Sequence, residues 1–102
     1  MFTLHIEHAV SDFVVWERAY AGFAGHRSRA GVVADRVARP VEDDAYVLLD
    51  LDFPTLDQAR GFERFLHDQV WSTPALSPAL AGSPRTVVVR RELADPGTTG
   101  SG

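Results

Sequence analysis

The sequence predicts a small α+β domain in the order βαββαβ: a four-stranded antiparallel sheet with two helices on one face and a second copy of the chain on the other. Two stretches with helical spacing are flanked by short stretches of alternating hydrophobicity. A length of 102 residues suits one core and is too short for two. The sheet face away from the helices mixes apolar and charged side chains, which indicates a protein surface as its cover.

Residues 2–10 predict the first strand, with Leu4, Ile6 and His8 on one face. Residues 11–30 predict the first helix, because bulky side chains recur at steps of three and four and Ser11 or Asp12 can cap the first turn. These bulky side chains belong to Phe13, Trp16, Tyr20, Phe23 and Ala24.

Gly31 ends this helix, and residues 32–39 predict the second strand. Pro40 and the acidic residues 42–44 then predict a hairpin turn. Residues 45–53 predict the third strand, whose helix-facing side is apolar throughout. That side carries Val47, Leu49, Leu51 and Phe53.

Thr55 and Gln58 predict a capping box that starts a second helix, which ends near Trp71. Its buried stripe consists of Ala59, Phe62, Leu66 and Val70. Residues 72–84 form an apolar connection rich in proline, which we expect to close over one end of the helix layer. Residues 85–93 predict the fourth strand, so 1–93 form the single domain, and 94–102 predict a disordered tail.

With right-handed crossovers this order gives the ferredoxin-like arrangement, with the first and third strands at the centre of the sheet. The uncovered face is expected to carry Thr3, His5, Glu7, Tyr46, Leu48, Asp50, Asp52, Val88 and Arg90. Its charged residues His5, Glu7, Asp50, Asp52 and Arg90 are therefore predicted at a homodimer interface, where their charges compensate in pairs.

Composition excludes several classes of protein. The chain has no cysteine, which removes disulfides, thiolate nucleophiles and Cys-based metal sites. Its net charge is −4, and its basic residues are dispersed arginines, so we expect no nucleic-acid partner. The sequence shows no secretory signal and no stretch long enough to span a membrane, and we expect a soluble cytoplasmic protein.

The stretch Glu7-His8-Ala9-Val10-Ser11-Asp12-Phe13, with Trp16 and Tyr20, resembles the first strand and helix of uncharacterised dimeric α/β barrel proteins. The resemblance covers residues 2–93, including the 51–55 entry to the second helix. It implies the dimeric barrel fold of antibiotic-biosynthesis-monooxygenase-like and stress-responsive proteins. That superfamily includes cofactor-independent monooxygenases, cyclases, haem-degrading enzymes and isomerases. Several oxygenase and haem-degrading members place an asparagine beside a tryptophan, whereas this chain has no asparagine.

His8 is the leading catalytic candidate, because it shares the helix-facing side of the sheet with the aromatic residues of the first helix. It is either a general base or a core histidine bonded to backbone. The Tyr20 hydroxyl can orient a carbonyl or relay a proton. Trp16 and Phe23 are predicted to bind a flat ligand or to fill the core, and Trp71 to border the pocket or anchor the following connection. We expect no metal and no cofactor, since no metal-ligand or nucleotide-binding spacing occurs.

These features favour a homodimer that binds a small aromatic or polyketide-like molecule between sheet and helices. If catalytic, it is a cofactor-independent monooxygenase, cyclase or isomerase with His8 as base. The competing hypothesis is a non-catalytic binding or stress-associated protein of unknown ligand, in which the cavity is filled and His8 is structural. A third is an accessory protein that acts through its dimer surface.

Overall fold

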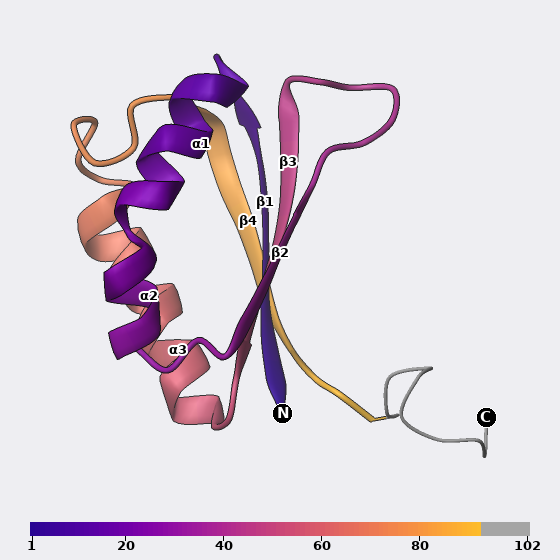
Figure 1. Cartoon of the computed structure of the whole chain (residues 1–102), viewed down its shortest axis with the longest axis vertical. Helices are drawn as coiled ribbons and strands as arrows, with labels where there is room; N and C mark the ends of the chain where they lie inside the picture. The colour runs from indigo at the N-terminus through magenta and orange to yellow at the C-terminus, as the bar shows by residue number, and fades with distance from the viewer. Residues whose placement is uncertain (93–102) are drawn as a thin grey trace.

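An antiparallel sheet with the spatial order β2-β3-β1-β4 forms one layer, and the helices pack against one of its faces (Figure 1). The computed structural model describes residues 1–92. The elements are β1 Phe2–Val10, α1 Phe13–Gly22, α2 Ala24–Arg29, β2 Ala34–Ala38, β3 Tyr46–Phe53, α3 Leu56–Phe65, the π-helical turn η1 Leu66–Val70, and β4 Leu80–Arg90. The predicted fold class and the central position of the first and third strands are confirmed. Leu93 and the predicted tail 94–102 lie outside the described residues.

The core lies between the central strands and α3. Alternation along β1 and β3 places Leu4, Ile6 and Leu51 on the helix side, where they are almost completely buried. Phe62 and Ala59 of α3 cover them. The apolar face predicted for the third strand is thus the centre of the core.

The predicted first helix is two helices, because the chain leaves helical geometry at Phe23, with φ −96° and ψ 8°. Gly22 directly precedes the break, and glycine has a low helix propensity. Asp12, not Ser11, caps α1 by accepting a hydrogen bond from the Val15 amide at 3.2 Å. Gly31 ends α2 as predicted, with a φ of 103° that favours glycine.

The second predicted helix starts with the expected capping box, in which Thr55 and Gln58 bond each other's backbone amides. Its last turn widens into η1, where the Trp71 amide donates to the Leu66 carbonyl at 2.8 Å. This bond spans five residues instead of four, so Trp71 lies closer to the line of Leu66 than it would in an α-helix. A regular helix would have turned Trp71 away from the buried stripe.

The fourth strand begins at Leu80, five residues before its predicted start. The register of its pairing with β1 shifts between Glu7 and Ala9. One residue of β1, His8, therefore lies opposite three residues of β4, Gly82, Ser83 and Pro84. Gly82 has a φ of 69°, and β4 is an edge strand, where proline is tolerated. The sequence pattern concealed this start, because glycine and proline usually mark loops.

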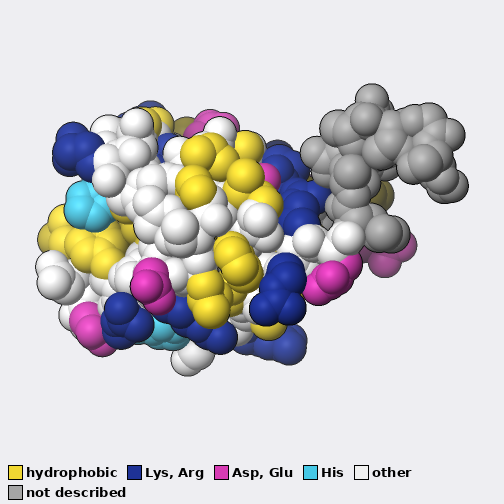
Figure 2. All heavy atoms as spheres, turned by 90° about the horizontal axis from the view of Figure 1, so that it is seen from below, with side chains coloured by type: hydrophobic (Ala, Val, Ile, Leu, Met, Phe, Trp, Pro, Cys, Tyr) yellow, Lys and Arg dark blue, Asp and Glu magenta, His cyan; other side chains and the backbone are white. Residues whose placement is uncertain are grey.

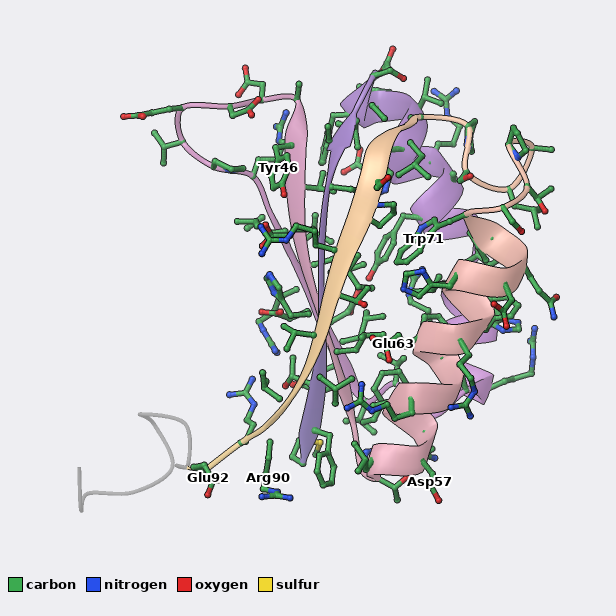
Figure 3. All side chains as sticks on the ribbon, turned by 180° about the vertical axis from the view of Figure 1, so that it is seen from behind. Tyr46, Asp57, Glu63, Trp71, Arg90 and Glu92 are labelled. Atoms are coloured by element: carbon green, nitrogen blue, oxygen red, sulfur yellow. The ribbon has the colours of Figure 1, made fainter. Side chains whose placement is uncertain are left out.

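The predicted faces of this strand were wrong. Arg90 pairs with Phe2 and Val88 with the buried Leu4, and directly paired residues share a face. Val88 and Arg90 therefore lie on the helix side, with Arg90 at the lower end of β4 (Figure 3). Val87 and Val89 occupy the open face instead, where they are 49% and 42% exposed.

The open face combines these valines with charged residues. Figure 2, which views the molecule from below and so looks along the sheet at one end of the two layers, shows hydrophobic side chains at that end beside arginine and acidic side chains. Among residues 1–92, no helix is long and apolar enough to cross a membrane.

Candidate functional site

A cavity of about 80 Å³ lies between the sheet and the helices. Its walls come from both strands of the sheet centre, all helices, the connection after η1 and the start of β4. The lining residues are Ile6, His8, Trp16, Ala19, Tyr20, Phe23, Arg27, Leu49, Leu51, Phe62, Phe65, Leu66, Val70, Trp71, Leu76, Ser77, Pro78 and Leu80. The five predicted catalytic and ligand-binding residues, His8, Trp16, Tyr20, Phe23 and Trp71, all lie on this one cavity.

His8 stands on β1 at the bulge of β4, and its side chain is directed to the helix side, where it is 4% exposed. Its Nδ1 lies 2.8 Å from the Ala9 carbonyl oxygen. Because a carbonyl only accepts hydrogen bonds, Nδ1 must carry the imidazole proton, which leaves a lone pair on Nε2. Burial lowers the pKa of His8, so its neutral form persists below the usual pH range of a histidine.

Nε2 of His8 makes no hydrogen bond to another residue of the described part of the chain and keeps some accessible surface, and His8 lines the cavity. The ring has Trp16 on one side and Trp71 on another, both edge-on, at centroid distances of 6.2 and 6.4 Å. The imidazole is therefore held by a backbone bond and two indole rings, with one nitrogen available to a ligand.

Trp71 reaches the cavity because of the wide turn in η1. Figure 3 shows its side chain extending from the helix layer toward the sheet. Of its two predicted positions, the structure places it at the pocket. Sequence periodicity missed the reason, since a five-residue turn cannot be seen in a pattern built on 3.6 residues per turn.

The Tyr20 ring lines the cavity and stacks on Trp16 at 5.1 Å, whereas its hydroxyl donates to an Asp35 carboxylate oxygen on β2 at 2.5 Å. Burial and this hydrogen bond raise the pKa of Tyr20. Tyr20 therefore keeps its proton, and its hydroxyl already donates that proton in the hydrogen bond to Asp35. The arrangement favours a wall and orienting role for the ring over a proton relay.

Arg27 of α2 is a lining residue that the sequence prediction missed. The signal was present, because Arg27 follows Phe23 by four residues and Tyr20 by seven, and so continues the apolar stripe of the predicted helix. A charged residue on such a stripe is informative, since arginine is seldom buried without a partner.

Four of the other candidate residues, His5, Glu7, Asp50 and Asp52, lie on the opposite face of the sheet, separate from the cavity. His5 contacts Asp50 through Nδ1 at 2.7 Å and Glu7 through Nε2 at 2.9 Å. The hydrogen bond to Glu7, aided by Asp50, raises the pKa of His5 despite partial burial. Tyr46, which Figure 3 shows across the sheet from Trp71, donates to Glu7 at 2.8 Å.

Asp52 is the buried acid of this face. It accepts hydrogen bonds from Thr3 at 2.6 Å and from both Arg36 Nη atoms at 3.0 Å, and Arg36 is the main cause of its lowered pKa. The charges of this face are therefore already compensated within one chain, and Arg90, predicted here, lies on the helix side. Among the described residues, no group of three or more His, Asp or Glu side chains is arranged to hold a metal ion.

The fold and cavity define a ferredoxin-like α+β domain with an aromatic chamber between sheet and helices. No family model matches the sequence, and no curated protein matches it. Solved structures do match. SnoaB of Streptomyces nogalater, a cofactor-independent oxygenase, shares 17% identity at a TM-score of 0.70, with 93% of this chain and 96% of SnoaB covered.

A protein of Nitrosomonas europaea described as an antibiotic biosynthesis monooxygenase shares 15% identity at a TM-score of 0.67, covering 91% of this chain and all of that one. A dimeric ferredoxin-like protein from an uncultured marine organism shares 12% at a TM-score of 0.57, covering 90% and 97%. At these identities the likeness establishes the fold, which confirms the predicted structural resemblance.

Proposed function

We propose that the chain is a cytoplasmic homodimer that binds an aromatic or polyketide-like molecule in the His8 cavity and transfers a proton from it to His8. The observation that carries this proposal is the fixed tautomer of His8, whose protonated Nδ1 faces the Ala9 carbonyl and whose Nε2 is left as a base. The lowered pKa of His8 keeps that base unprotonated at neutral pH.

Proton transfer would break an acidic O–H or C–H bond of the ligand, place the proton on Nε2 and leave the electron pair on the ligand as a phenolate or enolate. As a cyclase or isomerase, the enzyme would use this anion for ring closure or for reprotonation at another carbon. As a monooxygenase, it would use molecular oxygen: a CH₂ group becomes C=O, and the second oxygen atom leaves with both hydrogens as water. This balance needs no added reductant or cofactor, and SnoaB is described as a cofactor-independent oxygenase of the same fold.

The size of the cavity favours the second candidate, a non-catalytic binding protein. Pockets for drug-sized ligands enclose roughly 300–1,000 Å³, whereas this one encloses about 80 Å³. A polyketide-like molecule therefore needs a wall to move. The connection that carries Leu76, Ser77 and Pro78 is a part of the wall that belongs to no helix or strand.

Catalysis is tested with anthrone, a tricyclic ketone with one acidic CH₂ group, by following oxygen uptake and the absorbance of anthraquinone. We expect His8→Gln to abolish the enzymatic rate, while His5→Gln, on the opposite face of the sheet, leaves it intact. If both variants match the wild type, His8 is not the base. Binding of anthrone without turnover by the wild type would instead support the non-catalytic candidate.

The homodimer is supported by the exposed Val87 and Val89 on the uncovered sheet face, because a second sheet would remove them from water. Sedimentation of the variant Val87→Glu/Val89→Glu tests it. We expect this variant to be monomeric and Val14→Glu, on the exposed side of α1, to remain dimeric. A monomeric wild type at high micromolar concentration would contradict the proposal.

A further inference from the structure

Arg27 is a buried cation in the wall of the cavity, with 9% of its surface exposed. It lies on α2, and its side chain extends back over α1. Burial of a charged group is costly unless an opposite charge or a set of hydrogen bonds compensates it. The partners of Arg27 therefore show whether its charge is compensated within the chain.

The partners that Arg27 has are neutral. Nη1 donates to the Tyr20 carbonyl oxygen at 2.6 Å, and the guanidinium carbon lies 3.6 Å from the centroid of the Tyr20 ring. Within residues 1–92, no carboxylate lies within 4.0 Å of the Arg27 nitrogens. Asp35, the acid bound to the Tyr20 hydroxyl, is itself exposed to solvent.

Asp52 is the other strongly buried charged residue among those described, and its charge is compensated by neighbouring side chains. Its carboxylate accepts two hydrogen bonds from Arg36 and one from Thr3. Arg27 is thus the exception among the buried charged groups of the described residues, and it is the one that lines a cavity.

We infer that Arg27 supplies the counter-charge for an anionic aromatic ligand, whose carboxylate, or whose phenolate or enolate oxygen, lies in the His8 cavity. The inference rests on the proposed function and specifies its substrate class. A guanidinium has five N–H donors, of which one is used by Tyr20, so a fork remains for an oxyanion. In an apolar cavity such an ion pair is stronger than in water.

The same placement links Arg27 to the proposed proton transfer. His8 and Arg27 line one cavity and are connected along its wall by the Trp16 and Tyr20 rings. A ligand that loses a proton to His8 becomes an anion, and Arg27 is the cation of that cavity. The remaining wall is mainly apolar and aromatic, which selects a ligand that is uncharged elsewhere.

The alternative is a purely structural Arg27 that caps the last carbonyls of α1, where the helix dipole favours a cation. The two roles differ in ligand selectivity. A structural arginine gives no preference between a carboxylate and an uncharged ligand of the same shape.

The test compares benzoate with benzamide, which have the same ring but differ in charge. Single-ring probes suit the small cavity. The chain has two tryptophans, and both line the cavity, so intrinsic fluorescence and ligand-observed NMR can follow binding. We expect the wild type to bind benzoate at least about tenfold more tightly than benzamide, as for a charge-assisted hydrogen bond.

Arg27→Met should remove this preference by weakening benzoate about tenfold or more, with benzamide changed by less than about twofold. Arg29→Met is the matched control, because it makes the same charge change on the exposed part of α2 and should keep the preference. Arg27→Lys should keep part of it, which provides a charged variant if Arg27→Met folds poorly.

Equal affinities in the wild type, or a preference that survives in folded Arg27→Met, would overturn the inference and leave the aromatic site of the proposed function intact. Absence of binding by both probes, in fluorescence and in NMR, would reject the ligand site itself and the inference with it.

Discussion

The Nδ1 atom of His8 lies 2.8 Å from the carbonyl oxygen of Ala9, the next residue of the same strand. A local backbone acceptor therefore fixes the tautomer of a histidine that two tryptophans enclose. The bulge of β4 beside His8 interrupts the regular ladder at this point.

The pKa of His8 predicts where it titrates. Burial lowers this pKa from the usual value of about 6.5. On acidification the unfolded chain therefore takes up the proton first, and the wild type loses stability relative to His8→Gln as the pH falls below about 6.5. NMR titration of the imidazole C–H should give a midpoint below 6.5, and a midpoint at or above 6.5 would contradict burial as the dominant effect.

Leu76 lies on the connection after η1, lines the cavity and is 41% exposed, and we predict that it limits access to the cavity. We expect Leu76→Ala to speed the association of benzamide, followed by stopped-flow tryptophan fluorescence, at a stability cost of about 1 kcal/mol, small because Leu76 is half exposed. Leu56→Ala is the control, since Leu56 is also 41% exposed but lies at the start of α3, away from the cavity. Equal rates in the three proteins would show that ligands enter elsewhere.

His5 predicts a second pH dependence with the opposite sign. Its hydrogen bonds to Glu7 and Asp50 raise its folded-state pKa, so its stabilising contribution is full below about pH 6.5 and is lost as the pH rises through the raised value. In chemical denaturation, the substitution His5→Gln should lower the free energy of unfolding by more at pH 5.5 than at pH 8.5. A difference independent of pH would mean that protonated His5 does not bridge the two acids.

Two glycines with positive φ should respond differently to alanine. Gly82→Ala meets no atom within 4 Å, so its cost is the left-handed backbone alone, about 1 kcal/mol. A Cβ at Gly31 would also lie 2.5 Å from Nε2 of Gln58, whose side chain belongs to the capping box of α3. Gly31→Ala should therefore lose more stability by thermal and urea unfolding, and equal losses would contradict the contact with Gln58.

The sequence by itself determined the order of the strands and the two helical regions, and the side on which His8 lies. Alternation along 2–10 and 45–53 is a period-two pattern that survives in any packing, and it placed Leu4, Ile6 and His8 correctly. The capping box of Thr55 and Gln58 is formed by residues three apart, so its geometry is also local.

Tertiary structure decided which faces meet. Because both faces of β4 carry valines, hydrophobicity does not indicate which face meets the helices. The long-range pairing of Leu4 with Val88 places Arg90 on the helix side. The break at Phe23 and the wide turn before Trp71 depend on how helices fit the sheet, as does the burial of Arg27 over Tyr20. Such contacts join residues through packing and register, which no periodicity of a single chain encodes.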